Sequence, residues 1–283
     1  MLKIASATIN PAARGVLNTL QAKVNSKSTY SEQVTYAKKQ WDSKTSSQVK
    51  RAAFKHIRET LSALCIGPVR CAYCEDSLAE QIEHIRPKDF FPDICFDFDN
   101  YLYACGPCNR PKSNRYGRVV GNEVEEDVRR RNDPVLPPPT GPTALIDPRF
   151  EDPLSFFDLD LGGTMPDGTP VDATFQIFTR DGISLADAAR SEFTIDVLKL
   201  NRDVLCEARR NAFGGFRSRL RDYVQQKLGG APEIALARLR DDLMYTPHLT
   251  VFFEMRRQRQ YHPDLDVLFE DAPEALNWPL TPL

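Results

Sequence analysis

Residues 71–74 read Cys-Ala-Tyr-Cys, residues 82–88 read Ile-Glu-His-Ile-Arg-Pro-Lys, and residues 99–112 read Asp-Asn-Tyr-Leu-Tyr-Ala-Cys-Gly-Pro-Cys-Asn-Arg-Pro-Lys. The two Cys-x-x-Cys pairs supply thiols at the spacing that is typical of a tetrahedral structural zinc site. The four candidate zinc ligands are Cys71, Cys74, Cys105 and Cys108. One ion bound to all of them would join the two ends of a unit of about fifty residues and contribute directly to its folding.

Two other interpretations of these cysteines stay open. They could be free, partly buried thiols, or one pair could have a redox role, although neither pair lies on a strand-to-helix turn of the thioredoxin type. The remaining cysteines, Cys65, Cys95 and Cys206, are expected to be small buried hydrophobic residues. An odd total of seven cysteines, four of them at metal-type spacing, favours a reducing compartment over a disulfide framework.

The segment between the cysteine pairs carries candidate catalytic residues. His84 is a candidate general base, because a neutral imidazole can accept a proton from water near neutral pH. In an ideal strand the neighbouring Glu83 would point to the opposite face, so a strand end or a bulge is needed to bring both into one cleft. Asn109, directly after the last cysteine, offers an amide oxygen to a hard divalent cation such as Mg²⁺.

The ordered set of Glu-His-x-x-Pro, Asp-Asn before an apolar strand and Cys-x-x-Cys-Asn-x-x-Lys resembles the HNH endonuclease motif of the ββα-metal superfamily. The resemblance covers about forty residues. It departs from the commoner pattern in having Glu at the acidic position and Asn at the last position. The fold it implies is an α+β chain, mainly helical around a zinc-stapled ββα-metal (HNH) unit, with a helical C-terminal region.

The resemblance also implies a role for each matched residue. Glu83 and Asn109 would hold a catalytic Mg²⁺ or Mn²⁺, His84 would activate water, and Asn100 would orient the histidine. Arg110 and Lys112 match the basic tail that contacts phosphate in the family. The implied reaction is hydrolysis of a phosphodiester bond with one catalytic metal ion, leaving a 5′-phosphate and a 3′-hydroxyl.

The charge distribution bears on the substrate. The formal net charge is -2, whereas a free-standing nucleic-acid binder is usually basic. Basic residues slightly outnumber acidic ones between His84 and Arg118, and Arg86 and Lys88 join Arg110 and Lys112 as candidate nucleic-acid contacts. DNA is the expected substrate, RNA is not excluded, and the weak overall attraction suggests a partner that helps to recruit it.

A second, looser resemblance extends over more of the chain. The N-terminal helices, Leu145-Ile146-Asp147-Pro148-Arg149 and Leu200-Asn201-Arg202 resemble the nuclease subunits that accompany ATPases in bacterial antiphage systems of the Septu type. The resemblance implies an ABC or SMC-like ATPase partner and a role in antiviral defence. Two alternatives remain: a non-catalytic, zinc-stabilised module for nucleic-acid binding or assembly, and a stand-alone restriction-type nuclease.

Bulk composition limits the class of protein. With 283 residues, 41% hydrophobic and 27% charged, the chain is long enough for one large domain or two and has the composition of an ordered soluble protein. It contains no apolar run of the roughly 20 residues that a membrane-spanning helix needs, and no signal-peptide core at its start. A cytoplasmic location without membrane partners is expected.

Hydrophobic periodicity and proline content divide the chain into four expected regions. These are an N-terminal helical region (1–68), the zinc-stapled unit (69–131), a proline-rich linker (132–148) and a mostly helical C-terminal region with a short strand pair (149–283). Within them we expect a helical stretch over 29–64, strands over 82–85, 101–105, 156–161 and 173–178, a helix from residue 108 or 109, and helices over 235–244 and 250–259.

One long C-terminal helix is expected to bury a stripe in which apolar residues recur at every fourth position from Val204 to Leu228. A cluster of arginines on the same helix and another near the C-terminus are each expected either to face solvent or to contact nucleic acid or an acidic partner. The first contains Arg209, Arg210, Arg217, Arg219 and Arg221, and the second contains Arg256, Arg257 and Arg259. The other histidines, His56, His248 and His262, lack metal-type spacing and are expected to be ordinary surface or core residues.

Overall fold

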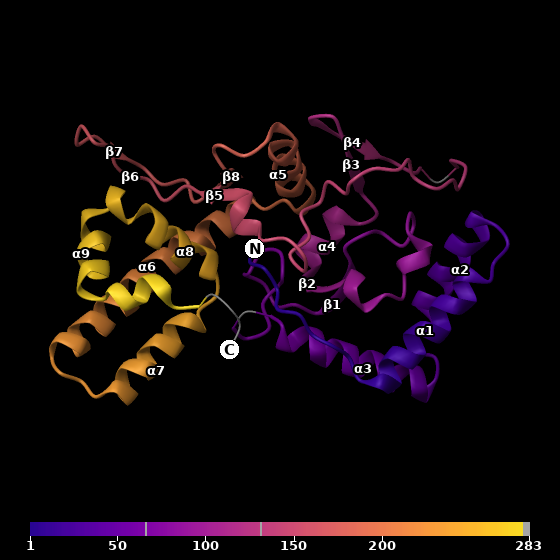
Figure 1. Cartoon of the computed structure of the whole chain (residues 1–283), viewed down its shortest axis with the longest axis horizontal. Helices are drawn as coiled ribbons and strands as arrows, with labels where there is room; N and C mark the ends of the chain where they lie inside the picture. Colours follow the sequence, from indigo (N-terminus) through magenta and orange to yellow (C-terminus); the bar gives the residue numbers. More distant parts are fainter. Residues whose placement is uncertain (66, 131, 280–283) are drawn as a thin grey trace.

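The computed structural model describes residues 1–65, 67–130 and 132–279. The chain is α+β, as expected: about half of it is helical, and its strands form small antiparallel pairs. Figure 1 shows an elongated molecule with the N-terminal helices at one end, the C-terminal helices at the other, and a strand pair with a short helix between them. Among the described residues, none of the helices combines the length and the apolar composition that crossing a bilayer requires.

The N-terminal end consists of α1 (Pro11–Asn25), α2 (Tyr30–Asp42) and α3 (Gln48–Ala63). The helical stretch expected over 29–64 is therefore two helices, interrupted after Asp42. The interruption is rich in Ser and Thr, whose side chains compete for backbone hydrogen bonds. Ser47 ends it by accepting a hydrogen bond from the Lys50 amide at 3.2 Å, which caps α3.

The centre of the molecule is a hairpin followed by a helix. Strand β1 (Gln81–His84) pairs antiparallel with β2 (Tyr101–Ala104), and α4 (Gly106–Lys112) follows directly. Both strands lie where the sequence predicted them. The helix begins two or three residues earlier than predicted, because Cys105 occupies the cap position and proline at position 107 is favourable in a first helical turn.

A second hairpin, β3 (Tyr116–Val120) with β4 (Glu123–Asp127), was not predicted. Its turn contains Gly121, whose positive φ of 61° suits glycine. The hairpin packs against α5 (Leu185–Leu198). The proline-rich segment that follows β4 has no regular secondary structure in its described residues, as its proline content predicted.

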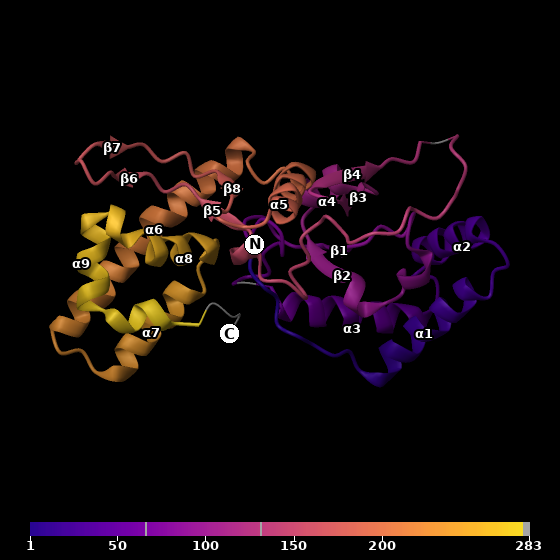
Figure 2. The same ribbon diagram turned by 45° about the horizontal axis from the view of Figure 1, so that its top comes forward.

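The C-terminal end begins with short strands. Strand β5 (Phe157–Leu159) pairs with β8 (Ile177–Thr179), so the expected strand pair is present, although both strands are shorter than predicted and the second begins at Ile177 instead of residue 173. Strand β6 (Gly163–Thr164) pairs with β7 (Pro170–Val171). Four helices follow α5: α6 (Asp203–Leu228), α7 (Glu233–Met244), α8 (Leu249–Gln258) and α9 (Pro263–Asp271). Helices α7 and α8 confirm the predictions, whereas α9 was not predicted. Figure 2 shows the β6–β7 hairpin extending over this helical group.

Helix α6 buries the middle of the predicted stripe but not its ends. Val204 and Leu228, the two ends of the expected stripe, are exposed, whereas Phe216, Leu220 and Val224 within it are buried. A spacing of four residues advances by about 40° per step on a helix with 3.6 residues per turn, so a long every-fourth-residue row turns away from the core. Arg209 is also buried, and it donates hydrogen bonds to the carbonyls of Phe175 and Leu200 instead of facing solvent or a partner.

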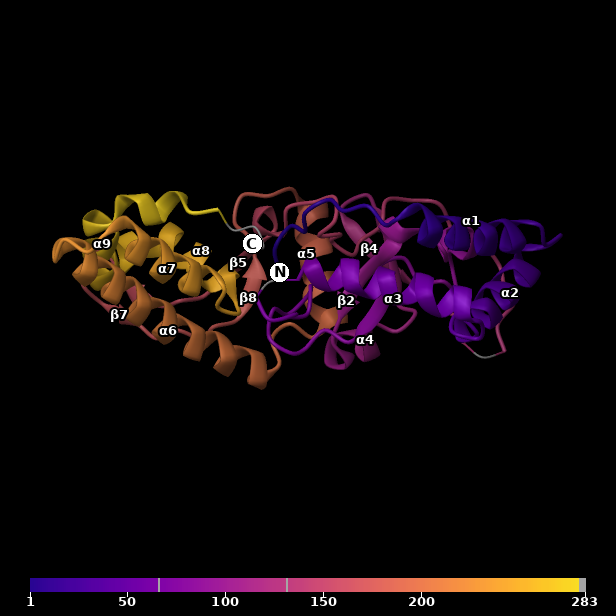
Figure 3. The same cartoon turned by 90° about the horizontal axis from the view of Figure 1, so that it is seen from below.

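Two hydrophobic clusters meet at the central hairpin. The first contains the four cysteines, Leu102 and Ala104 together with buried residues of α5–α9, so the cysteine region and the C-terminal helices share one core. The second contains residues of α1–α3 together with Cys95, Phe96, Phe98 and Tyr101. In Figure 3 α3 crosses β2, and these two elements are in contact. Core 1 and core 2 denote these two clusters below.

Candidate functional site

The four predicted zinc ligands come together. Their sulfur atoms all lie within 4.8 Å of one another, and the Sγ atoms of Cys74 and Cys105 are 3.8 Å apart. Four sulfurs bound tetrahedrally to zinc at about 2.3 Å lie roughly 3.8 Å from one another, so this group has the dimensions of a zinc site. All four residues are buried, and the cluster could hold a metal ion such as zinc.

Local backbone geometry positions these thiols. The first pair lies in a turn closed by the Glu75 amide, which donates to the Cys71 carbonyl at 2.9 Å, and Glu75 itself has a positive φ of 61°. The second pair spans the start of α4, where the amides of Cys108 and Asn109 both donate to the Cys105 carbonyl. Arg202, at the N-cap of α6, donates from Nη2 to the Cys108 sulfur at 3.5 Å. The C-terminal helices therefore contact the cysteine cluster directly.

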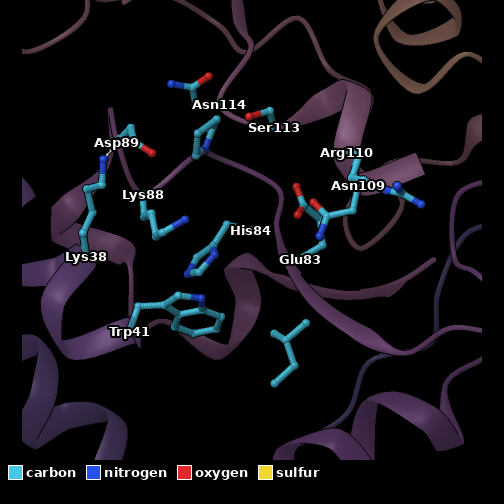
Figure 4. Close-up of a pocket in the computed structure, with 12 residues that line it drawn as sticks. Lys38, Trp41, Glu83, His84, Lys88, Asp89, Asn109, Arg110, Ser113 and Asn114 are labelled. Atoms are coloured by element: carbon cyan, nitrogen blue, oxygen red, sulfur yellow. Dashed lines mark hydrogen bonds and ion pairs between the residues drawn. The ribbon is translucent and has the colours of Figure 1, made fainter. Parts of the chain in front are cut away.

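His84 ends β1 and lies at the base of a cavity of about 400 Å³ (Figure 4). Its Nε2 is 2.9 Å from the Cys95 carbonyl oxygen, which can only accept a hydrogen bond. Nε2 must therefore carry the proton of the neutral ring, and Nδ1 is left as the acceptor. Burial, with a smaller contribution from the Lys88 charge, lowers the pKa of His84 to about 3, so the ring is neutral at physiological pH.

Two aromatic side chains fix the plane of this imidazole. The Trp41 ring of α2 lies 4.2 Å from the His84 ring, centroid to centroid, and the Tyr101 ring of β2 lies 5.2 Å away. The Tyr101 hydroxyl also donates to the Cys95 carbonyl at 2.7 Å, so His84 and Tyr101 share one acceptor. The ring therefore has little freedom to rotate, which suits a base that must meet its proton donor in one orientation.

Glu83 lines the same cavity as His84, although adjacent strand residues alternate in direction. The strand ends at His84, which allows both side chains to reach one space. The Lys112 ammonium lies 2.5 Å from Glu83 Oε1 and donates to the His84 carbonyl at 2.8 Å. Burial raises the pKa of Glu83, and the Lys112 charge opposes that shift. The carboxylate is thus placed to pair with a cation.

The two predicted asparagines have different surroundings. Asn109 lines the cavity, and its Nδ2 donates to Gln81 Oε1 at 2.7 Å, so Oδ1 is the atom of this amide that a cation would meet. Asn100 is buried beneath the β1–β2 loop, where Oδ1 accepts from the Arg86 amide at 2.8 Å and Nδ2 donates to the carbonyls of Arg86 and Ile94. The Asn100 side chain thus holds the loop that carries Cys95, and Cys95 in turn contacts His84.

The four predicted basic residues do not all line the cavity. Lys88 and Arg110 line the cavity, whereas Arg86 is exposed and packs over the Phe91 ring at 5.8 Å. Lys112 is fully buried, and its ammonium is bound to Glu83 and His84 beneath the cavity. In this position it supports the site from inside and does not face a ligand.

Several residues that line the cavity were missed by the sequence reasoning, among them Lys38, Trp41 and Asp89. Lys38 and Trp41 lie one helical turn apart on α2, and Lys38 forms an ion pair with Asp89, with 2.5 Å between Nζ and Oδ1. In the sequence, the spacing of three residues indicates only that Lys38 and Trp41 lie on the same face of a helix. It does not indicate what that face contacts. The histidines expected to have no site role, His56, His248 and His262, do not line this cavity.

No model of a protein family, no curated protein and no solved structure matches this chain. Any function of this chain must therefore be inferred from the geometry of the site itself. That geometry combines a neutral imidazole with an available Nδ1, a carboxylate paired to a cation, an amide oxygen, and basic side chains at one cavity (Figure 4).

Proposed function

We propose that the chain is a metal-dependent endonuclease of the HNH type that hydrolyses phosphodiester bonds in DNA. One observation carries the proposal: His84, Glu83 and Asn109 line a single cavity, together with the basic side chains of Lys38, Lys88 and Arg110. An acceptor nitrogen beside oxygen ligands and positive charge is what hydrolysis of an anionic diester requires.

The residues present suit a divalent cation. Glu83 already pairs through Oε1 with the Lys112 ammonium, so positive charge is favourable at this position. Glu83 and Asn109 would hold Mg²⁺ or Mn²⁺, and oxygen ligands are those that such ions prefer. When bound, the ion would supply Lewis-acid stabilisation of the charge that develops on phosphate.

His84 would accept the proton of the attacking water at Nδ1. The Cys95 carbonyl, which accepts a hydrogen bond from Nε2, would stabilise the positive charge that the ring acquires. A bound phosphodiester would raise the pKa of His84 from its low value, because an adjacent negative charge favours the imidazolium. Lys38, Lys88 and Arg110 would offset the charge of the strand.

A cleavage assay with zinc-loaded protein tests this proposal. Wild type should cut DNA when Mg²⁺ or Mn²⁺ is added, and His84→Ala should lower the rate by about 10²- to 10⁴-fold, as is typical for loss of a general base. His56→Ala is the matched control, because His56 lies on α3 and accepts from the Asn10 amide outside the cavity. Equal cleavage by both variants, with zinc content unchanged, would leave a non-catalytic zinc module as the better interpretation.

The antiphage role and the ATPase partner belong to the same proposal. Their support is the resemblance of the sequence to Septu-type nuclease subunits and the net charge of -2, which gives the chain weak overall attraction for nucleic acid. Affinity purification from the native host should recover an ATPase with this chain. If the chain alone cuts a defined DNA site at full rate, the stand-alone restriction-type nuclease is correct instead.

A further inference from the structure

A second cavity adjoins the one that contains His84. The first, called the site cavity here, has a volume of about 400 Å³, and the second, called the side cavity, has about 440 Å³. Three residues line both of them: Lys38, Asp89 and Asn114. The remaining lining of the side cavity comes from α2 and from the segment after β4, including Arg129 and Arg130. Only a wall of side chains therefore separates the two spaces.

The wall is an ion pair between two elements. Lys38 of α2 and Asp89 of the β1–β2 loop approach to 2.5 Å, and their side chains are 49% and 16% exposed. Such a partly exposed pair contributes little stability, because solvent screens its attraction. The Lys38 ammonium can therefore exchange its carboxylate partner for a phosphate at low cost. The ion pair is an adjustable part of the wall.

The rest of the wall is held in place. Arg129 donates to the carbonyls of Asp89 and Leu136, and its guanidinium lies 4.4 Å from the Phe90 ring. This fixes the segment after β4 against the β1–β2 loop. Basic side chains recur along the two cavities, from Arg110 and Lys88 past Lys38 to Arg129 and Arg130, and they outnumber the carboxylates of Glu83, Asp89 and Asp133.

The size of the site cavity limits what can reach His84. Both His84 and Glu83 are only 5% exposed, so a phosphate must descend into the cavity to meet them. A volume of about 400 Å³ is that of a small-molecule site, whereas duplex DNA is bound on broad open surfaces. A strand freed from its complement can enter, as with enzymes that act on extruded or single-stranded nucleotides.

We propose that the site cavity and the side cavity form one channel for a single-stranded nucleic acid, and that Lys38 leaves Asp89 to bind a phosphate between them. This inference rests on the proposed nuclease function and specifies its substrate class. The shared chemistry is a single-stranded phosphodiester backbone, which DNA and RNA both supply. Asp89 acts as a competitor of the substrate for Lys38.

Binding should be measured by fluorescence anisotropy on the zinc-loaded full chain without added Mg²⁺ or Mn²⁺. The probes are one sequence as single-stranded DNA, as single-stranded RNA and as duplex DNA. We expect single strands to bind about tenfold more tightly than the duplex. Asp89→Asn should tighten single-strand binding by about three- to tenfold, and Lys38→Ala should weaken it by a similar factor, because one phosphate contact is gained or lost.

The opposite signs distinguish this mechanism from general damage. Lys55→Ala is the matched control, since Lys55 is an exposed α3 lysine paired with Glu59 at 3.7 Å, and it should change nothing. In Lys38→Ala/Asp89→Asn the gain from Asp89→Asn should vanish. Duplex binding as tight as single-strand binding, or equal effects of Lys38→Ala and Lys55→Ala, would overturn the proposal. The DNA and RNA arms show which single strand the channel prefers.

Cleavage is scored separately from binding, so the two proposals can fail independently. If single strands bind with the expected variant pattern but no substrate is cut in Mg²⁺ or Mn²⁺, the channel stands and the nuclease function fails. If duplex DNA is cut in a His84-dependent way and binds at least as tightly as single strands, the nuclease function stands and the channel fails.

Discussion

The two ends of the β1–β2 hairpin are held by different interactions. At the end where Gln81 pairs with Ala104, four buried thiols gather in core 1, among residues of the C-terminal helices. At the end where His84 pairs with Tyr101, a histidine, a buried ion pair and aromatic rings lie against core 2 and the N-terminal helices. Stability is concentrated at the cysteine end and polar chemistry at the histidine end, and four residue pairs of sheet join them.

Removing one of the four candidate metal ligands at the cysteine end should have the largest effect. We expect Cys105→Ser to lose zinc and to lower the free energy of unfolding by several kcal/mol, because binding of structural zinc is coupled to folding, at about 10–16 kcal/mol in zinc-finger peptides. Zinc content by mass spectrometry and the melting temperature check this. Cys206→Ser is the control, since that thiol lies outside the cluster. A variant without zinc that melts like wild type would contradict the assignment.

At the histidine end, the buried pair should matter next. Lys112→Met leaves Glu83 buried without its cation, and removal of one partner of such a pair costs about 3–5 kcal/mol. Adding Glu83→Gln should restore much of the loss, because a neutral amide needs no counter-charge. Urea unfolding of zinc-saturated protein measures both values. If Lys112→Met and the double variant were equally stable, the unpaired carboxylate of Glu83 would not be the cause of the lost stability.

The smallest effect is a pH dependence from His84. Because burial lowers the pKa of His84 to about 3, the unfolded chain binds a proton between pH 6.5 and 3 that the folded chain does not. The folded state therefore loses stability as pH falls through this window, by about 1 kcal/mol at pH 5.5. Urea unfolding with zinc present measures this effect. Between pH 7.5 and 5.5, the free energy of unfolding of wild type should fall by about 1 kcal/mol more than that of His84→Gln. Parallel losses would place the ring in contact with solvent.

The sequence predicted the cysteine end better than the histidine end, for a physical reason. The cysteine spacing, the short strands and the start of α4 can each be predicted from residues that are neighbours in the sequence. One metal ion bound to the four cysteines would hold these elements together. The surroundings of His84 depend on Trp41 and Lys38, which reach it from a helix more than forty residues away. Periodicity identifies the buried face of such a helix without identifying what it covers.

Lys112 shows the same limitation within a single motif. Its position in Asn-x-x-Lys was read as a surface cation for phosphate, but three helical residues after Asn109 its ammonium lies inside the hairpin–helix junction. Whether a lysine faces out or in depends on a buried carboxylate within reach, and the sequence places Glu83 thirty residues earlier. The interruption between α2 and α3 was also missed. Its Ser-rich sequence indicates a break in the helix, but the helical periodicity on both sides of it favoured one continuous stretch.

The continuity of core 1 has a consequence for fragments of this protein. The exposed proline-rich segment separates the cysteine region from the C-terminal helices in sequence, yet buried residues on both sides of it, such as Leu102 and Leu220, belong to one apolar interior. A protease that nicks the backbone once between the exposed residues Thr140 and Gly141 should therefore leave two pieces that co-elute as a single particle. If the two halves are expressed as separate polypeptides, each should expose the apolar surface that it buries against the other. On mixing they should reassemble, as in fragment complementation.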